Sequence, residues 1–397
     1  MNILIVEPYY TGSHAAWAEG YKKNSRHNVE ILSLPGRSWK WRMHGGAVTL
    51  SSDFLAEGQR PDLILATDML DLSTFLALTR PLSHGIPTAI YFHENQFTYP
   101  WHPDDRVRQR GRDSHYGFIN FVSALAAERV FFNSAYHLES FLLGLSEYLG
   151  KYPDFQRTLY VDTIREKSAV LYVGMDFKAL DSSAPAAEAL LRTSKEPPLL
   201  LWNHRWEFDK NPEIFFRALY ILMDRGLDFE VAILGENFRG SPLVFKEARE
   251  RLGERVVHFG FVEDFSAYAR WLKRADILPV TSRHDFFGCS VVEAIYSGCF
   301  PLLPHGLAYP EHLSASGLGG NKGEADDVKM CFYEGFDGLI RGLERVLISI
   351  DKVRKTSFKA HVTRYGWPQM APLYDREMER VARGGITGKR PLPAPTL

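Results

Sequence analysis

The sequence predicts an α/β protein of two domains, each built on a parallel sheet covered by helices. The chain has 397 residues, which is too long for one ordinary core. Short apolar runs alternate with helix-like segments almost throughout, as in repeated βαβ units. The alternation pauses once, over residues 175–198, which are rich in Ala, Ser and Pro. We therefore expect a first domain over 1–174, an interdomain linker over 175–198 and a second domain over 199–367.

The strands of both domains are expected to be buried on both faces, because they read as continuous apolar runs. In the first half these runs are 3–6, 29–34, 62–66, 88–92, 129–132 and 169–173. In the second half they are 199–202, 230–234, 256–259, 276–280 and 300–304. Beyond them, 368–383 predicts a helix that returns to the first domain. The Pro/Gly-rich segment 384–397 predicts a disordered tail.

Composition indicates a cytoplasmic globular enzyme. Hydrophobic residues make up 45% of the chain and charged residues 24%, with a net charge of −1, so the whole chain gives no signal for nucleic-acid binding. We expect no transmembrane segment, because no apolar run approaches the roughly 18 residues that a span needs. Met1 leads directly into a strand-like run, so we expect no signal peptide. The three cysteines lack paired or metal-binding spacing, which fits a reduced compartment.

Open parallel sheets bind ligands beyond the carboxyl ends of their strands, so the loops there carry the chemistry. The first such loop, EPYYTGSH (7–14), contains His14 and only one glycine, Gly12. It lacks the G-x-G-x-x-G pattern, which weakens a dinucleotide-oxidoreductase interpretation. Gly12 would let the backbone approach a ligand ahead of a helix, although a plain strand–helix turn is an equal alternative.

The loop FHENQFTYP (92–100) gathers polar side chains after the fourth strand. His93, Glu94 and Asn95 stand together there. Such groups could bond sugar hydroxyls or orient an acceptor. The alternative is hydrogen bonding within the loop itself.

The loop WNHRWEFDKNP (202–212) opens the second domain with two cations, Arg205 and Lys210. A guanidinium fork and an ammonium ahead of a helix suit a diphosphate. The alternative is solvated surface charge.

The segment HDFFGCSVVEA (284–294) places two carboxylates around a predicted helix over 290–297. Asp285 lies before that helix and Glu293 about one turn inside it. The amides near Gly288, Cys289 and Ser290 would favour an anion. We expect Glu293 to bind ribose hydroxyls and Asp285 to bind sugar hydroxyls. A capping acid with a buried ion pair is the alternative.

HDFFGCSVVEAIYSGCFPLLP (284–304) resembles the E-x7-E region of retaining GT-B glycosyltransferases of the family 4 type, with Asp285 in place of the first Glu. WNHRWEFDKNPEIFFRAL is similar to the Arg/Lys diphosphate region of that family, although "NH" replaces its usual glycine. FFNSAYHLESF (131–141) resembles its "NS" segment. The resemblance implies a GT-B fold, that is, two Rossmann-like parallel-sheet domains facing a cleft.

Three N-terminal segments resemble one particular group of these glycosyltransferases. ILIVEPYYTGSH, LPGRSWKWRMHGGA and YFHENQFTYP are similar to the tRNA-queuosine alpha-mannosyltransferase group. This implies transfer of mannose from GDP-mannose to queuosine in the anticodon of an aspartate tRNA. Alternatives are a family 4 enzyme with a glycan, lipid or small-molecule acceptor, a sugar-nucleotide epimerase, and a non-catalytic RNA-binding protein.

The residues and the resemblance together predict the roles of the site residues. The catalytic group is Arg205, Lys210, His93 and Asp285; the donor-binding group is Gly12, Asp285, Phe286, Phe287, Gly288, Cys289, Ser290 and Glu293; the acceptor-binding group is His14, Trp39, Lys40, Trp41, Arg42, Glu94 and Asn95. We expect no metal and no cofactor beyond the nucleotide sugar as co-substrate, because the cations neutralise the leaving diphosphate and no D-x-D motif is found.

Two basic segments could contact RNA. Trp39, Lys40, Trp41 and Arg42 could combine base stacking with phosphate contact. Four arginines, at 106, 108, 110 and 112, could add salt-sensitive affinity for the RNA backbone. The alternatives are a packed tryptophan pair and a solvated loop.

Overall fold

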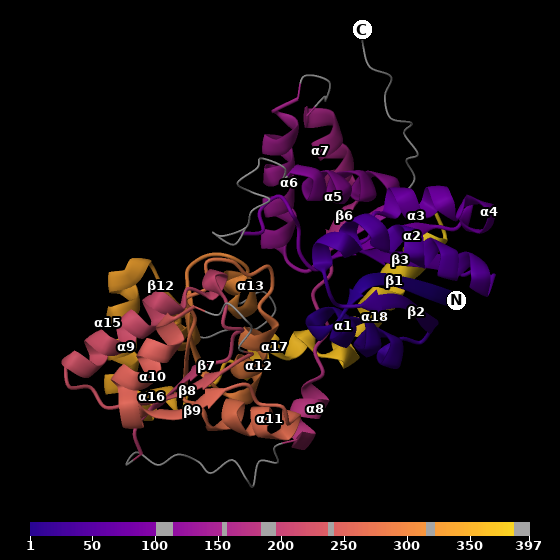
Figure 1. The fold of residues 1–397 in the computed structure, drawn as a ribbon. Coiled ribbons are helices and arrows are strands. Elements are labelled where there is room, and N and C mark those ends of the chain that lie inside the picture. Colours follow the sequence, from indigo (N-terminus) through magenta and orange to yellow (C-terminus); the bar gives the residue numbers. More distant parts are fainter. Residues whose placement is uncertain (101–113, 153–156, 184–195, 237–241, 315–321, 385–397) are drawn as a thin grey trace. The chain divides into compact units, whose positions relative to one another are not determined.

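The chain forms two compact units in the computed structural model, which describes residues 1–100, 114–152, 157–183, 196–236, 242–314 and 322–384. Unit 1 is Met1–Gly174 with Trp367–Leu397, and unit 2 is Met175–Gly366. Each unit contains a six-stranded sheet with flanking helices (Figure 1), and every strand pair is parallel. The α/β fold with two parallel sheets, predicted from the alternating pattern, is confirmed.

The sheet of unit 1 has the strand order β2-β1-β3-β4-β5-β6. Its strands are β1 (Asn2–Tyr10), β2 (Asn28–Pro35), β3 (Leu63–Thr67), β4 (Thr88–Phe92), β5 (Arg129–Phe132) and β6 (Ser168–Val170). β3 and β4 are buried along their whole length, as their apolar sequences predict. The chain moves outward from β1 to β2 and then returns to β3 on the other side of β1. The strand order therefore reverses at β1, where open sheets form a crevice for ligands.

Most helices of unit 1 lie between its strands in sequence, and the last helix follows them all. They are α1 (Gly12–Asn24), α2 (Trp39–Glu57), α3 (Leu72–Leu78), α4 (Arg80–Ser83), α5 (Ser114–Ala126), α6 (Ala135–Leu149), α7 (Arg157–Glu166) and α18 (Trp367–Ala382). The "NS" segment has a structural explanation: Ser134 accepts a hydrogen bond from the His137 amide at 2.9 Å and so caps α6.

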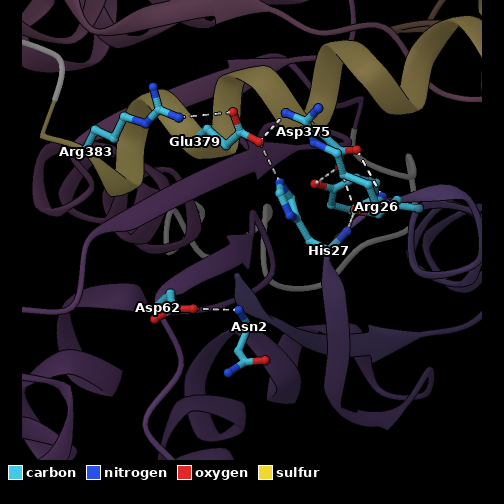
Figure 2. Close-up of polar contacts among 9 residues, drawn as sticks. Asn2, Arg26, His27, Asp62, Asp375, Glu379 and Arg383 are labelled. Atoms are coloured by element: carbon cyan, nitrogen blue, oxygen red, sulfur yellow. Dashed lines mark hydrogen bonds and ion pairs between the residues drawn. The ribbon is translucent and has the colours of Figure 1, made fainter.

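The last helix, α18, belongs to unit 1 although it follows all of unit 2 in sequence. Its residue Asp375 is buried and accepts hydrogen bonds from Tyr21 Oη (3.0 Å), Ser25 Oγ (2.6 Å) and the Arg26 amide (3.1 Å). One turn later Glu379 lies 3.1 Å from His27 Nε2 (Figure 2). These bonds join α18 to α1 and to the turn before β2. Residues 385–397, almost all of the expected tail, lie outside the described residues.

The sheet of unit 2 has the order β12-β11-β10-β7-β8-β9. Its strands are β7 (Leu199–Trp202), β8 (Glu230–Leu234), β9 (Val256–Gly260), β10 (Ile277–Pro279), β11 (Phe300–Pro304) and β12 (Phe332–Tyr333). Its helices are α8 (Phe177–Ser183), α9 (Pro212–Asp224), α10 (Val244–Leu252), α11 (Phe265–Arg274), α12 (Cys289–Ser297), α13 (Tyr309–Leu313), α14 (Lys322–Met330), α15 (Gly335–Ile348), α16 (Ile350–Val353) and α17 (Lys359–Val362).

The segment expected to be a linker, 175–198, contains a helix. Unit 2 begins at Met175, and α8 packs the Phe177 ring on Tyr296 of α12, with ring centroids 3.8 Å apart. Residues 184–195 lie outside the described residues. Among the residues that the structure does describe, no helix is both long enough and apolar enough to cross a membrane.

Candidate active site

In unit 2, the loop after β10 ends at a glycine that starts α12. Gly288 has φ 82°, in the left-handed region, and is buried. A Cβ atom there would lie 3.2 Å from Tyr309 Cε1 and 3.4 Å from Asp285 Oδ2. Both the conformation and the space therefore favour glycine. Since a glycine has no side chain to cap the first turn, the amides that follow can bind an anion.

Lys210 lies in a buried cluster of charges beside this turn. Its Nζ atom is 3.2 Å from Asp209 Oδ2 and 3.5 Å from Asp285 Oδ2, and it donates to the His284 carbonyl at 3.0 Å. Burial acts to lower the pKa of Lys210, but Asp285 and Asp209 outweigh it and raise the pKa above its ordinary value. The lysine is therefore a fixed, preorganised positive charge.

Asp285 is held by two groups. Tyr309 Oη donates to its Oδ2 atom at 2.9 Å, and Lys210 Nζ lies 3.5 Å from the same oxygen. Burial acts to raise the pKa of Asp285, but the charge of Lys210 and the hydrogen bond from Tyr309 lower it below its ordinary value, so the carboxylate is ionised. The structure thus joins Asp285, Lys210 and Gly288, which the sequence places in two separate segments.

Arg205 lies in the same loop as Lys210 but in a different environment. Its side chain is 52% exposed and pairs with Glu207 Oε2 at 3.1 Å. The two predicted diphosphate-binding cations therefore differ: Lys210 is rigid and buried, whereas Arg205 can reorient toward a ligand.

Glu293 is partly buried on α12 and accepts a hydrogen bond from Tyr268 Oη at 2.8 Å. Burial raises the pKa of Glu293 to about 7, although the Tyr268 hydrogen bond opposes the rise. An acid in this state is well suited to hydroxyl donors, which would favour its ionised form.

Four other predicted donor-site residues surround this turn. Phe286 and Phe287 are buried. The Phe286 ring centroid lies 4.3 Å from that of His284, and the Phe287 ring centroid lies 5.0 Å from that of His312. Cys289 and Ser290, in contrast, are partly exposed in the first turn of α12.

In unit 1, a histidine pair lies at the carboxyl ends of β1 and β4. His14 Nδ1 is 3.0 Å from Oε2 of Glu7, a fully buried carboxylate. The His14 and His93 rings are 4.2 Å apart between centroids. Burial acts to lower the pKa of His14, but Glu7 and, more weakly, Asp68 raise it to about 9, so His14 is an imidazolium at neutral pH.

His93 is the neutral member of the pair. Its amide donates to Asp68 Oδ1 at 2.7 Å, and its carbonyl accepts from Asn133 Nδ2 at 2.9 Å. Burial and the nearby charge of His14 hold the pKa of His93 well below its ordinary value. Its Nε2 atom is buried with no hydrogen-bond partner among the described residues, as expected for a group that awaits a ligand.

The same cluster is the candidate metal site. Glu7, His14 and His93 each offer one ligand atom, and these atoms lie within 4.8 Å of one another. His14 already pairs with Glu7 in the protonated form, whereas a metal would need its free nitrogen. The absence of a metal remains a prediction.

The two polar atoms of the Asn95 side chain differ in their surroundings. The residue is fully buried, and its Oδ1 atom accepts from the Phe97 and Thr98 amides, both at 3.1 Å. These bonds stabilise the loop itself, whereas Nδ2 is buried and, within the residues that the structure describes, has no hydrogen-bond partner. Glu94 is partly exposed and accepts from Gln96 Nε2 at 2.9 Å.

The Trp39–Arg42 segment is the first turn of α2. Its four side chains do not form one continuous surface for stacking and phosphate contact. Trp39 packs against Tyr116 with ring centroids 5.2 Å apart, and Lys40 Nζ lies 5.6 Å from the centroid of the Trp39 ring. Trp41 is 63% exposed and lies along Gly45. Arg42 Nε donates to the Pro35 carbonyl at 3.1 Å. Of these four side chains, Trp41 alone offers a mostly exposed ring.

Gly12 and the arginine cluster are also predicted to take part in binding. Gly12 begins α1 with φ 50°, and nothing lies within 4 Å of a Cβ placed there. The reason for a glycine is therefore its conformation and not crowding. The arginines at 106–112 lie outside the described residues.

Several site residues were not identified from the sequence. They are Glu7, Asp68, His204, Asp209, Tyr268 and Tyr309. Glu7 and Asp68 carry a usable signal, since each follows an apolar strand run. The two tyrosines lie on helices distant in sequence from their partners, so only the fold reveals them.

Comparison with known proteins supports a glycosyltransferase relationship. A family model described as tRNA-queuosine alpha-mannosyltransferase N-terminal matches residues 2–175. A Mycobacterium tuberculosis protein, GDP-mannose-dependent alpha-(1-6)-phosphatidylinositol dimannoside mannosyltransferase, is 23% identical over 65% of this chain and 61% of its own.

Solved structures share the fold. Sucrose-phosphate synthase from Thermosynechococcus elongatus aligns with a TM-score of 0.69 at 13% identity, covering 97% of this chain and 100% of that one. Anabaena HepE in complex with UDP and glucose aligns with a TM-score of 0.62 at 15% identity, covering 96% and 99%. These likenesses show the GT-B fold alone and confirm that prediction.

A relative that matches over most of both chains shows the family. The tRNA-queuosine alpha-mannosyltransferase of Drosophila melanogaster is 35% identical over 314 residues, which are 78% of this chain and 81% of that protein. The chain therefore belongs to the tRNA-queuosine alpha-mannosyltransferase family.

Proposed function

We propose that the protein transfers mannose from GDP-mannose to queuosine in the anticodon of tRNA-Asp, with retention of the anomeric configuration. The observation that carries the proposal is the 35% identity to a tRNA-queuosine alpha-mannosyltransferase over most of both chains. The buried charge cluster around Lys210 supports it with a site suited to a diphosphate.

The donor would bind to unit 2. Its diphosphate would lie against the first turn of α12, with Lys210 and Arg205 supplying positive charge. Glu293 would accept hydrogen bonds from the ribose hydroxyls, and Asp285 from the sugar hydroxyls. Because these side chains neutralise the leaving group, the proposed reaction needs no cofactor and no metal.

The acceptor would bind to unit 1. The imidazolium of His14 and the neutral Nε2 of His93 offer polar contacts beside the ends of β1 and β4. Trp41 offers an exposed aromatic surface for a base. A tRNA acceptor requires a compartment that contains tRNA, consistent with the cytoplasmic location expected from the sequence.

The chemistry would proceed without a protein nucleophile. The acceptor hydroxyl attacks the anomeric carbon on the face from which the diphosphate departs. Its proton passes to a donor phosphate oxygen, so the products are the mannoside and GDP. The protein contributes fixed charges and orientation.

The test is a donor assay with total tRNA in a chelating buffer, read by mass spectrometry of the nucleosides. We expect one hexose added to queuosine from GDP-mannose, and none with tRNA that lacks queuosine. A queuosine peak that keeps its mass with every sugar nucleotide would refute the proposal. Incubation with donor alone tests the epimerase alternative, since only an epimerase would change the sugar.

A second candidate is mannosyl transfer to a lipid-linked acceptor. The similarity to a phosphatidylinositol dimannoside mannosyltransferase favours it, although that match is weaker and covers less of each chain. The same assay with phosphatidylinositol mannoside vesicles in place of tRNA separates the two candidates.

A further inference from the structure

His204 follows β7 and lies beside the charge cluster of unit 2. It is 3% exposed, and its Nδ1 atom lies 3.2 Å from Ser290 Oγ in the first turn of α12. Its Nε2 atom is buried and has no hydrogen-bond partner within the described part of the chain. Buried polar atoms are nearly always paired, so an unpaired one beside a binding site points to a ligand.

The backbone at His204 is rigid, so the position of the ring is well defined. Trp202 Nε1 donates to the His204 carbonyl at 3.0 Å. A Cβ atom at Gly235 would lie only 2.0 Å from the same carbonyl, and Gly235 has φ 119°. Any other residue at 235 would displace His204.

The ring is neutral at physiological pH. Burial lowers the pKa of His204 to about 4, and the ammonium of Lys210 acts in the same direction. A neutral imidazole carries one proton, on the nitrogen opposite the one that accepts a hydrogen bond. If the Ser290 hydroxyl donates to Nδ1, the proton lies on Nε2, which becomes a donor.

We propose that His204 is a further donor-site residue, whose Nε2–H donates a hydrogen bond to a phosphate oxygen of a nucleoside diphosphate, with the Ser290 hydroxyl fixing the tautomer. The inference rests on the proposed function only for the class of ligand. A neutral donor here adds a directed hydrogen bond without placing another positive charge beside Lys210. It also explains the "NH" that replaces the family glycine before Arg205.

The test compares His204→Ala, His204→Gln and Ser290→Ala with the control His258→Ala. His258 belongs to the same unit and bonds the Gly260 carbonyl at 3.1 Å. GDP and guanosine affinities are measured by calorimetry, with a melting curve for each variant. We expect His204→Ala to lower the affinity for GDP about 10- to 100-fold, the usual effect of losing a hydrogen bond to a charged group. Guanosine affinity should stay unchanged.

His204→Gln supplies an amide N–H and should recover part of the GDP affinity. Ser290→Ala should weaken GDP binding less than His204→Ala does. Without the Ser290 hydroxyl the His204 proton can move to Nδ1, but the imidazole ring is still present. Unchanged GDP affinity in a folded His204→Ala variant would overturn the inference and leave the proposed function standing. Equal losses for GDP and guanosine would also overturn it. A wild-type protein that binds neither GDP nor UDP would instead overturn the proposed function, and this inference with it.

Discussion

Glu293 is a carboxyl group whose ionisation should be coupled to ligand binding. In the free protein its pKa is raised to about 7, mainly by burial, so near pH 6.5 much of it is protonated. Ribose hydroxyls that donate to the carboxylate would stabilise the ionised form and lower the pKa. We therefore predict that GDP-mannose binding at pH 6.5 releases part of a proton. Calorimetry in two buffers of different ionisation enthalpy measures this release.

The matched variant is Glu293→Gln, which keeps the size of the side chain and a partner for Tyr268. It should bind GDP-mannose much more weakly and release no proton from this site. Glu293→Ala should abolish measurable binding while the fold survives. Donor affinity equal to the wild type in either variant would exclude the ribose role.

Arg205 and Lys210 should respond differently to removal, because only one of them is buried. Arg205→Ala should lower kcat by about 10²-fold, as for loss of a charge that matters most in the transition state. Its stability should change by less than about 1 kcal/mol, because its ion pair with Glu207 is half exposed. Steady-state kinetics and denaturant unfolding check both values.

Lys210→Ala leaves Asp209 and Asp285 without their shared cation. Removing one partner of a buried ion pair costs roughly 3–5 kcal/mol, so this variant should lose stability as well as activity. The sequence alone predicts a mainly catalytic effect for both cations, since it does not reveal which one is buried. Near wild-type turnover in Arg205→Ala would contradict the assignment.

At the scale of elements, the two tryptophans in the first turn of α2 lie in different environments: Trp39 is packed, whereas Trp41 is exposed. Trp41→Ala should weaken tRNA binding about ten- to a hundredfold, because base stacking contributes roughly 1–3 kcal/mol. Trp39→Ala should instead cost roughly 1–3 kcal/mol of stability, because Trp39 packs against Tyr116. Binding titrations with tRNA and unfolding curves distinguish them. A stable Trp41→Ala variant with full tRNA affinity would move the acceptor site away from α2.

The docking of α18 depends on small residues beneath the Trp367 indole. A Cβ atom at Gly20 of α1 would lie 2.2 Å from Trp367 Nε1, and Trp367 is only 3% exposed. Gly20→Ala should therefore destabilise unit 1 by about 1–2 kcal/mol, even though alanine favours the helix. The control is Gly306→Ala, where nothing lies within 4 Å. Equal unfolding midpoints for the two variants would contradict this packing.

The elements that the sequence predicts best are those with an unbroken apolar pattern. The run at 88–92 is β4 residue for residue, and the helix expected after Arg205 and Lys210 is α9. The helix α2 is not apparent, because Gly45 and Gly46 discourage a helix. The structure explains both: Trp41 covers Gly45, and a Cβ at Gly46 would lie 3.0 Å from Pro8. Such reasons are tertiary and leave no local signal.

The candidate site divides in the same way. Its cations and carboxylates stand out in sequence because they follow predicted strands. Their burial and partners do not: the sequence does not reveal that Phe286 packs on the His284 ring or that Asn95 Oδ1 accepts from an amide of its own loop. Distinguishing a residue that touches a ligand from one that shapes the loop requires the side-chain environment.

At the scale of the whole molecule, the proposed donor contacts belong largely to unit 2. Saturating GDP should therefore slow hydrogen exchange around 203–211 and 285–293, with little change in the core strands of unit 1. Binding to the native state also raises its stability, by about 2.7 kcal/mol at a hundred times Kd. Hydrogen exchange with mass spectrometry at increasing GDP measures both effects. Protection confined to unit 1 would contradict the assignment of the donor site.

The return of α18 to unit 1 affects how the chain can mature on the ribosome. Unit 2 is one continuous stretch of sequence, whereas unit 1 lacks α18 until Trp367 and the residues after it have been synthesised. Domains of a nascent chain usually fold in order of synthesis. Here the second unit can reach its native state before Trp17 and Tyr21 can form their hydrogen bonds to Tyr374 and Asp375. A nascent chain that stalls before Trp367 therefore exposes these aromatic side chains of α1 to chaperones, and the N-terminal unit is complete only after α18 has been synthesised.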